Sequence, residues 1–522
     1  MEKQDMKSKT EQAASTEVSR RGFLRILGVA GALMTAPAMA LNFFKGDAEA
    51  AAIRMLPKKW DDEVDVVIVG SGFAGLSAAA EAAVRGSSTM VIEKMPIYGG
   101  NSRINGGGFN AWTDKLKLRE TLKRGDDSAD LHFNDTLSGG DYYNIPELVR
   151  VLVDNAPSAM NWMLDDGDLK LKNVLVRIGG HSAYRDHVTL DGTGRGYVDA
   201  LKKIADRNGV KKIRLRTKLT WIWRKDPSSP ILGIEVDTPR GIQNIRVKKA
   251  LVLTSGGFGR DLQMRKMFNP NISDAYNSTN QPGATGEAIR YAQAIGADAL
   301  QLCFIQLYPT ADPDSGTLDK YALYPSRMPS YGGVFVDYKG KRFVGELERR
   351  DVVSRAEINS GGKQAYTVFT EKMIPNVTTP EEVQGGITAG RVWKANTLSE
   401  LAQMMGVPGG ALEDTISKHN QFLKAGKDPQ FNKPFTPQML AIGEGPYYSV
   451  AQWPSVHHCM GGLRINPLAQ VIDIWGQPIP RLYAAGEVTG GVHGSNRLGA
   501  NATPDAVVFG RIAGTNAAKE KE

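Results

Sequence analysis

A glycine-rich turn between an apolar segment and an alanine-rich segment constrains the fold of this chain more than any other feature. Residues 64–70 are short and almost continuously apolar, which predicts a buried parallel strand. The motif Gly70-x-Gly72-x-x-Gly75 follows, then an Ala-rich predicted helix and a second predicted strand over residues 89–93. This order predicts the βαβ unit of a Rossmann-like α/β fold that binds a dinucleotide.

Each glycine of the turn has a physical role in such a fold. Gly70 permits the tight turn, Gly72 lets the backbone approach a pyrophosphate, and Gly75 lets the helix pack closely on the strand. The phosphates would lie at the helix N-terminus, where free N–H groups and the helix dipole favour anions. Glu93 lies about twenty residues further on, where an acid accepts hydrogen bonds from the adenosine ribose.

Two further glycine-rich segments favour FAD over NAD as the dinucleotide. Residues 99–102 are GGNS and residues 106–108 are three glycines, a pattern typical of the part of FAD enzymes that lines the pyrophosphate and flavin. Near the other end of the chain, residues 485–491 (AGEVTGG) precede a predicted helix that begins at Thr503. The N-terminus of that helix would stabilise the negative charge of a reduced flavin.

The first residues of the chain form an export signal. Ser19-Arg20-Arg21 opens a twin-arginine motif, and an uncharged run rich in Gly and Ala follows over residues 26–44. We expect residues 1–50 to be a cleaved twin-arginine signal peptide, which directs the folded protein to the periplasm. The alternative is a membrane anchor, but the run is only mildly apolar. We therefore expect no membrane anchor after cleavage.

Composition excludes several other functions. The net charge is +8, but Lys and Arg are spread along the chain, so nucleic acid is a poor candidate partner. The only cysteines are Cys303 and Cys459, and no Cys-x-x-Cys-His haem attachment site is present. We predict no metal site, and any haem that serves this protein must belong to another chain.

The mature chain divides into three parts by its sequence pattern. Residues 60–303 contain the βαβ unit and form the first part of the FAD-binding domain. Residues 304–456 lack the strand–helix rhythm of that fold and are predicted to be an inserted domain. Residues 457–522 return to the FAD-binding pattern. The expected fold is therefore a Rossmann-like FAD-binding domain interrupted by an α+β domain.

Over residues 64–518 the chain resembles the flavoprotein part of the soluble periplasmic fumarate reductases. This flavocytochrome c family includes urocanate reductases and other 2-enoate reductases, and the haem domain is absent here. The resemblance rests on residues 70–76, 341–344, 350–351, 456–462 and 486–499, the last of which is GEVTGGVHGSNRLG. It implies that the inserted domain is a mobile clamp, or capping, domain.

The resemblance also implies the site residues and the reaction. The substrate is a small unsaturated carboxylate, whose C=C bond receives a hydride from flavin N5 and a proton from Arg350. Arg497 and His457 would hold the substrate carboxylate, and electrons would come from a separate c-type cytochrome. The predicted cofactor-binding residues are Gly70, Gly72, Phe73, Ala74, Gly75, Glu93, Lys94, Gly100, Asn101, Ser102, Gly107, Gly108, Gly257, His458, Glu487, Asn501 and Ala502.

Two departures from the family pattern bear on the substrate and on proton supply. Fumarate reductases carry a His-Pro-Thr motif whose His holds a second carboxylate, whereas this chain has Tyr308 before the Pro-Thr. We therefore expect a monocarboxylic enoate, such as urocanate, methacrylate or an aryl acrylate, with Tyr308 contacting it. The usual proton relay is not recognisable over residues 323–328, and Arg327 or Glu346 could replace it.

Other functions remain open at this stage. The chain could be a true fumarate reductase with a rebuilt second carboxylate site. It could also be a flavin dehydrogenase of the ketosteroid type, although a carboxylate clamp has no purpose on a steroid ketone. A third alternative is an electron-transfer flavoprotein without a substrate of its own, which the catalytic arginines argue against.

Overall fold

The computed structural model describes residues 54–210, 213–272, 274–318, 321 and 323–522. The predicted signal peptide, residues 1–50, lies outside the described residues. The chain separates into two units, Met1–Met55 and Leu56–Glu522, and every element below belongs to the second. No helix in the described part of the chain is both long and apolar enough to cross a membrane.

The first region is built on a mixed sheet of strand order β17-β18-β9-β1-β2-β6. Strand β1 pairs in parallel with β2 and β9, as the predicted βαβ unit requires, and β9 pairs in parallel with β18. The antiparallel strands β7 and β8 extend the sheet from β9. The bounds are β1 Asp62–Val69, β2 Thr89–Ile92, β6 Ile213–Arg214, β7 Lys218–Arg224, β8 Ile231–Thr238, β9 Gly241–Leu253, β17 Gln470–Ile472 and β18 Pro478–Ala484.

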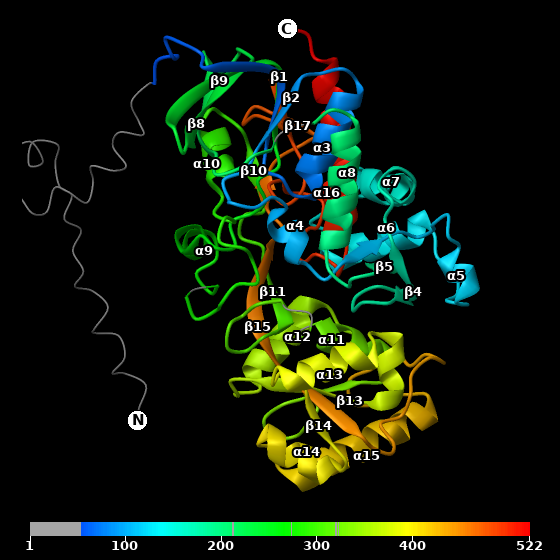
Figure 1. Cartoon of the computed structure of the whole chain (residues 1–522). Coiled ribbons are helices and arrows are strands. Elements are labelled where there is room, and N and C mark those ends of the chain that lie inside the picture. Colours follow the sequence, from blue (N-terminus) through cyan, green and yellow to red (C-terminus); the bar gives the residue numbers. More distant parts are fainter. Residues whose placement is uncertain (1–53, 211–212, 273, 319–320, 322) are drawn as a thin grey trace, which may run out of the picture. The chain divides into compact units, whose positions relative to one another are not determined.

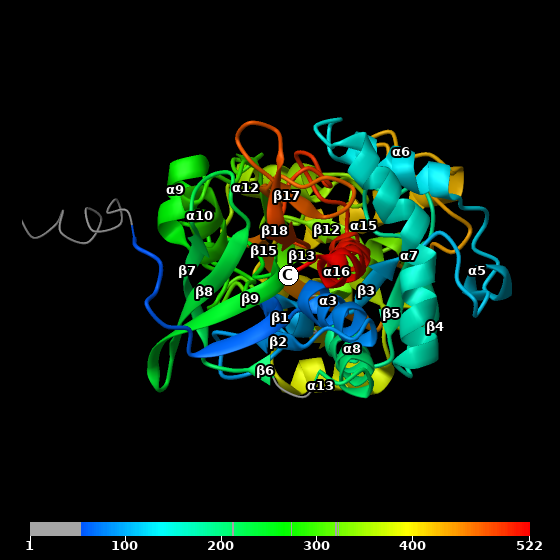
Figure 2. The ribbon, with the colours of Figure 1, turned by 90° about the horizontal axis from the view of Figure 1, so that it is seen from above.

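Two helices pack on this sheet, α3 Phe73–Val84 and α16 Ala502–Lys519, and two more pack in turn against them, α8 Arg195–Arg207 on α3 and α7 Pro146–Asp166 on α16. Helices α3 and α16 lie side by side in both views (Figures 1 and 2). Glycines allow this close approach, because a Cβ at Gly510 would lie 2.5 Å from the carbonyl oxygen of Ala74 and one at Gly514 would lie 2.2 Å from that of Ala78. The first and last parts of the sequence thus share one core.

The second region has a sheet of its own, of strand order β11-β15-β13-β12 with β14 paired to β15. Its bounds are β11 Ile305–Ala311, β12 Val334–Val336, β13 Ala365–Thr370, β14 Trp393–Ala395 and β15 Tyr447–Cys459. A separate hydrophobic core, formed by residues between Tyr324 and Ala451, packs around this sheet. In Figure 1, helices α13, α14 and α15 gather around β13 and β14.

Smaller sheets and shorter helices make up the rest of the described structure. Strands β3, β4 and β5 form a three-stranded sheet of order β3-β5-β4, and β10 pairs with β16. The strand bounds are β3 Gly108–Asn110, β4 Leu171–Val176, β5 Asp186–Thr189, β10 Ala299–Leu300 and β16 Gly462–Leu463. The remaining helices are α4 Gly100–Ile104, α5 Leu118–Thr121, α6 Ala129–Gly139, α9 Leu262–Phe268, α10 Glu287–Ala294, α11 Leu323–Arg327, η2 Met328–Tyr331, α12 Arg350–Asn359, η3 Glu371–Asn376, α13 Pro380–Thr388, α14 Leu398–Met405 and α15 Gly409–Ala425.

The predicted α/β class and the predicted parallel strands are confirmed. The predicted helix from Thr503 is α16, which begins one residue earlier. The boundary predicted between residues 456 and 457 falls inside β15, because that strand pairs with β11 near its C-terminal end and with β13 and β14 near its start. A single strand therefore links the two regions, so no sharp boundary exists at this position.

Candidate functional site

One large cavity collects most of the residues that the sequence predicts to be functional. Its lining extends from the turn at Gly70 to Arg350 and Arg497, so the predicted cofactor and substrate residues open into one space. The predicted residues that line it are Gly70, Gly72, Phe73, Ala74, Glu93, Lys94, Gly100, Asn101, Ser102, Gly108, Tyr308, Arg350, His457, His458, Glu487, Arg497 and Ala502.

The start of helix α3 forms the phosphate-binding end of the cavity. The residue before the helix is Gly72, which offers no side-chain cap. The N–H of Phe73, the first of the helix, donates to the hydroxyl of Ser102 at 2.9 Å, and the N–H groups of Ala74 and Gly75 remain available for an anion. A Cβ at Gly72 would lie 2.9 Å from the same hydroxyl, so only glycine keeps this approach open.

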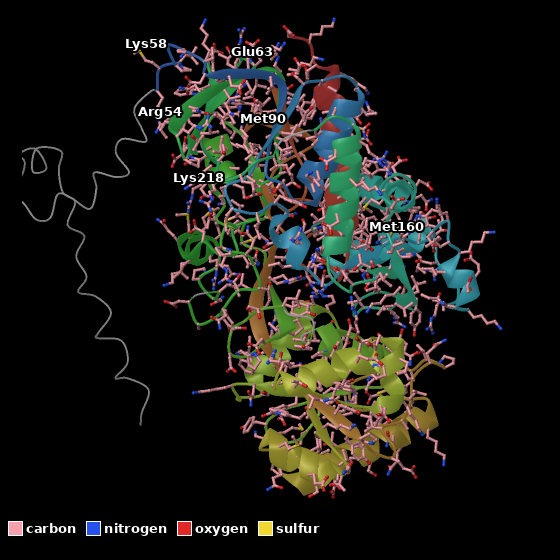
Figure 3. The ribbon with its side chains drawn as sticks, viewed as in Figure 1. Arg54, Lys58, Glu63, Met90, Met160 and Lys218 are labelled. Carbon is pink, nitrogen blue, oxygen red and sulfur yellow. The ribbon has the colours of Figure 1, made fainter. Side chains whose placement is uncertain are left out.

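Acidic and basic side chains lie at the predicted ribose end. Ser71 donates to Glu93 from its hydroxyl (2.6 Å) and from its backbone N–H (3.2 Å), which fixes the carboxylate at the end of β2. Lys94 donates to Glu287 at 2.8 Å, and Lys218, labelled in Figure 3, reaches the other oxygen of Glu287 at 3.3 Å. Although burial opposes it, the bond and charge of Lys94 hold the pKa of Glu287 down at about 2.

The N-terminus of helix α16 faces the opposite part of the cavity. No side chain caps this helix, and Ala502 at its first turn lines the cavity. Glu487 lines the cavity nearby and accepts a hydrogen bond from the Cys459 N–H at 3.0 Å. Burial raises the pKa of Glu487 to about 7. Burial and the charge of Arg497 hold the pKa of His458 well below its ordinary value, so this imidazole is neutral.

Four residues predicted to bind the cofactor lie outside the cavity lining, and close packing explains their positions. A Cβ at Gly75 would lie 2.0 Å from the Gly70 carbonyl oxygen, and one at Gly107 would lie 2.4 Å from the Thr189 hydroxyl. Gly257 packs in the same way against Glu487, 2.7 Å from where its Cβ would be. The fourth is Asn501, the residue before α16. Its side chain forms hydrogen bonds with the side chains of Asn110 (2.7 Å), His132 (2.9 Å) and Thr136 (3.0 Å).

Two guanidinium groups, the buried Arg497 and the partly buried Arg350, converge in the wall of the cavity. Arg350 is the first residue of α12, and Arg497 lies in the segment before α16. Both donate to the same atom, Oε1 of Gln306 on β11, at 3.2 Å from Arg350 and 2.9 Å from Arg497. Gln306 is held in turn because its Nε2 donates to Asn496 and to the Arg497 carbonyl, both at 2.7 Å.

Sequence reasoning missed Gln306. A signal for it exists, because alternate residues of a strand point the same way, and Gln306 lies two residues before Tyr308. Tyr308 itself lies between two predicted site residues: the Arg350 guanidinium is 4.7 Å from the centre of its ring, and the His457 ring is 4.9 Å away. Strands β11 and β15 place these groups together, since Tyr308 pairs with Ser455.

The two arginines lack direct ion pairs. Neither contacts a carboxylate in the described part of the chain, although Asp186 acts on Arg350 and Glu487 on Arg497 from further away, and Nε of Arg497 has no hydrogen-bond partner there. Burial lowers the pKa of Arg350, and burial with the charge of Arg350 holds that of Arg497 well below its ordinary value. Arg350 also lies at a helix N-terminus, where the dipole disfavours a cation. The arrangement therefore favours a bound anion.

His457 is a neutral hydrogen-bonding group beside these arginines. Burial and the charges of Arg350 and Arg497 hold its pKa well below the ordinary value of 6.5. Its Nδ1 lies 2.7 Å from the hydroxyl of Thr279, a residue that the sequence did not indicate. His457 can therefore offer its other ring nitrogen to a ligand without adding a further positive charge.

The two candidates for the proton relay lie in different places. Arg327, at the end of α11, lines the cavity and donates to the Gly106 carbonyl oxygen at 2.7 Å. Glu346 lies outside the cavity lining in a buried ion cluster, where it accepts from Arg342 at 2.6 Å and lies 3.2 Å from Lys433. The geometry thus favours Arg327 and assigns Glu346 to the packing of the second region.

The residues around the cavity fit FAD. The uncapped start of α3 and the open backbone at Gly72 suit the pyrophosphate, the Glu93 carboxylate suits the ribose, and the uncapped start of α16 suits the flavin carbonyls. Gly70 has φ +106°, and a Cβ there would lie 2.4 Å from the Thr254 carbonyl oxygen, so the turn requires glycine. The anion site of Arg350 and Arg497 opens into the same cavity.

Comparison with known proteins agrees with this geometry. The FAD binding domain family matches residues 65–503. The chain is 37% identical over 464 residues to fumarate reductase (cytochrome) of Shewanella frigidimarina, covering 88% of this chain and 77% of that protein. It is 35% identical to urocanate reductase of Eggerthella lenta (90% and 76% covered) and 33% identical to the acrylate reductase flavoprotein subunit of Shewanella woodyi (95% and 97% covered).

A solved structure shows the same fold. The open conformation of a flavocytochrome c3 fumarate reductase superposes with a TM-score of 0.70 and 34% sequence identity, covering 88% of this chain and 79% of that one. Together with the family match, this similarity extends over the FAD cavity and both regions around it. The chain therefore belongs to the FAD binding domain family as an oxidoreductase whose cofactor is FAD.

Proposed function

We propose that this protein reduces the C=C bond of an α,β-unsaturated carboxylate. The observation that carries the proposal is a pair of guanidinium groups in the cavity wall, Arg350 and Arg497, that share one amide oxygen and form no direct ion pair with a carboxylate among the described residues. Such a pair attracts a carboxylate from the substrate. Relatives named for the reduction of fumarate, urocanate and acrylate support the same class of reaction.

We assign three steps of the reaction to residues of the chain. Arg497 holds the substrate carboxylate with its planar fork, and the neutral His457 donates a hydrogen bond to the same group. When bound, reduced FAD supplies the hydride that the β-carbon accepts. Arg350 gives a proton to the α-carbon, a task made easier because burial and the start of α12 both lower the cost of losing its charge.

Tyr308 sets the substrate class in this proposal. Its ring lies against Arg350 and His457, and a phenol, unlike an imidazole, offers no cation for a second carboxylate. The expected substrates are monocarboxylic enoates with an aryl, imidazolyl or small apolar substituent. The second candidate is fumarate, which Arg327 favours, because this third guanidinium lines the same cavity.

The same proposal extends to the setting of the enzyme. The twin-arginine motif supports export to the periplasm, and a respiratory role there would be anaerobic. The absence of a haem attachment motif from the sequence supports a separate c-type cytochrome as electron donor. A relative named as a flavoprotein subunit supports a partner of this kind. We infer that residues 304–456, with their own sheet and core, act as the clamp that closes over the substrate.

A dye assay tests this function. The FAD-loaded protein is supplied with reduced methyl viologen under anaerobic conditions, and dye oxidation is followed with fumarate, methacrylate, urocanate, cinnamate and caffeate. We expect a monocarboxylate to react fastest, and Arg350→Ala to remove the activity. Arg355→Ala is the matched control, because Arg355 lies exposed on the same helix α12. If FAD is bound and no enoate oxidises the dye, the proposal is wrong.

A further inference from the structure

A buried aspartate that no step above uses lies in the wall of the same cavity. Asp186 is the first residue of β5 and is 1% exposed. No side chain in the described part of the chain donates a hydrogen bond to its carboxylate oxygens, and the backbone N–H of Phe109 is the donor that acts on them. A buried carboxyl with so few donors is rare, because each lost hydrogen bond to water must be replaced. Its position beside a ligand cavity therefore calls for a functional explanation.

The backbone of β5 places Asp186 in the wall of the cavity. Strand β5 pairs with β3, which sets Asp186 opposite Asn110 and beside Gly108. A Cβ at Gly108 would lie 2.4 Å from Oδ1 of Asp186, so the glycine makes room for the carboxyl. Asp186 and Gly108 line the cavity together with Arg327 and Arg350.

The charged and titratable groups around Asp186 come from several elements. The cations are Arg327 on α11 and Arg350 on α12, and His187 follows on β5 itself. The phenols are Tyr197 on α8, whose hydroxyl donates to the His187 carbonyl oxygen at 2.9 Å, and Tyr331 on η2.

Asp186 is the carboxylic acid among the groups just named. Burial raises its pKa to about 6, and the positive charges of Arg327 and Arg350, with the Phe109 N–H, keep it from rising further. The raised pKa means that the carboxyl holds its proton more readily than an exposed aspartate does. Asp186 is also the carboxyl whose charge acts on Arg350.

Building on the proposed function, we propose that Asp186 resupplies Arg350 with the proton that Arg350 gives to the substrate. Arg350 transfers one N–H proton to the α-carbon and becomes a neutral guanidine. The carboxylic acid of Asp186 then gives its proton to that guanidine, directly or through Arg327, and becomes a carboxylate. A water molecule in the cavity returns a proton to Asp186, so each turnover consumes one proton from solvent. Asp186 is thus a positioning and proton-supplying residue, whereas Arg350 touches the substrate.

The proposal predicts a specific pH dependence. The active form of Asp186 is the protonated one, and its fraction falls as pH rises through its pKa. The rate of enoate reduction should therefore fall by about tenfold per pH unit on the alkaline side of that pKa. This fall in rate is the alkaline limb of the pH profile. A residue that only supports the fold would not produce it.

The test measures steady-state enoate reduction by the FAD-loaded protein, with reduced viologen as electron donor, between pH 5 and 9 in wild type, Asp186→Asn and Asp186→Glu. We expect Asp186→Asn to lower kcat by about 10²-fold with KM nearly unchanged and to lose the alkaline limb. Asp186→Glu should keep the limb with a shifted midpoint. Infrared difference spectra between wild type and Asp186→Asn should show one protonated carboxyl band that titrates in wild type and is missing from the variant.

Glu357→Gln is the matched control. Glu357 is also a buried carboxyl with an unpartnered oxygen, and it lies on α12 with Arg350 but outside the cavity lining. This variant should keep the wild-type rate and pH profile. An active wild type without an alkaline limb, or an Asp186→Asn variant with the wild-type rate, would overturn the role of Asp186 and leave the proposed function intact. An inactive wild type would instead overturn the proposed function.

Discussion

Replacing Gln306 with leucine should disable the anion site without removing either arginine. The change deletes the oxygen that accepts from Arg350 at 3.2 Å and from Arg497 at 2.9 Å. A hydrogen bond to a charged group contributes about 1.5–3 kcal/mol. The substrate carboxylate can replace part of this loss when it binds, so we expect a net loss of roughly 2–4 kcal/mol in transition-state binding, or about 30- to 700-fold in kcat/KM.

Gln306→Glu provides a contrast of nearly equal shape. Its carboxylate would pair with both guanidinium groups, and one such contact is worth about 4 kcal/mol at 4 Å under an effective dielectric constant near 20. The variant loses the donor bonds to Asn496 and to the Arg497 carbonyl oxygen, but it keeps the two arginines paired. Because its charge neutralises the anion site, it should bind substrate poorly, and its defect should appear mainly in KM.

The assay is steady-state oxidation of reduced viologen by the best monocarboxylic enoate, with thermal unfolding and FAD content measured on each variant. We expect kcat/KM of the wild-type enzyme to be far higher than that of either Gln306→Leu or Gln306→Glu. A Gln306→Leu enzyme with FAD bound and kcat/KM within about threefold of wild type would refute the view that one amide oxygen organises the two arginines.

Three further predictions concern specificity, stability and cofactor retention. Tyr308→His should raise kcat/KM for fumarate relative to a monocarboxylic enoate by about tenfold, because an imidazole can carry a charge for a second carboxylate; an unchanged ratio would show that Tyr308 does not set the preference. Glu346→Gln should lower the free energy of unfolding by roughly 3–5 kcal/mol in urea titrations, because it leaves Arg342 with a weakened buried partner. Lys433 and Arg342 hold the folded-state pKa of Glu346, despite burial, at about 2, below its ordinary value, so its contribution is present above about pH 4.5 and is lost as pH falls toward 2; equal acid sensitivity of wild type and variant would contradict this. Gly75→Ala should yield protein without FAD or without a stable fold, since the added Cβ would lie 2.0 Å from the Gly70 carbonyl oxygen, and flavin absorbance per chain measures this directly.

Much of the FAD-binding region could be predicted from the sequence because its signals are local. The turn at Gly70, the apolar strands around it and the helix that begins near Thr503 are each encoded within about twenty residues. The close packing expected at Gly75 is present, since a Cβ there would lie 2.0 Å from the Gly70 carbonyl oxygen. Other packing residues were harder to separate from ligand-binding ones, because Asn501 belongs to a predicted cofactor segment, yet its side chain joins a network with Asn110.

The centre of the site was harder to predict because it depends on contacts between distant parts of the chain. Gln306 meets Arg497 only because β11 lies beside the segment that precedes α16, 191 residues away in sequence. Asp186 carries no sequence signal of its own, since an acid in a polar segment is usually exposed. The pairing of β5 with β3 places Asp186 in the wall of the cavity.

The most direct test of the account is a single turnover of the reduced protein with one substrate. FAD-loaded protein, reduced stoichiometrically without oxygen, is mixed rapidly with a monocarboxylic enoate, and the return of oxidised flavin absorbance is followed while the product is identified. The account predicts fast reoxidation with one saturated acid formed per flavin, and loss of that phase in Arg350→Ala with FAD still bound. Reoxidation at the wild-type rate in Arg350→Ala, or no reoxidation by any enoate in wild type, would contradict it.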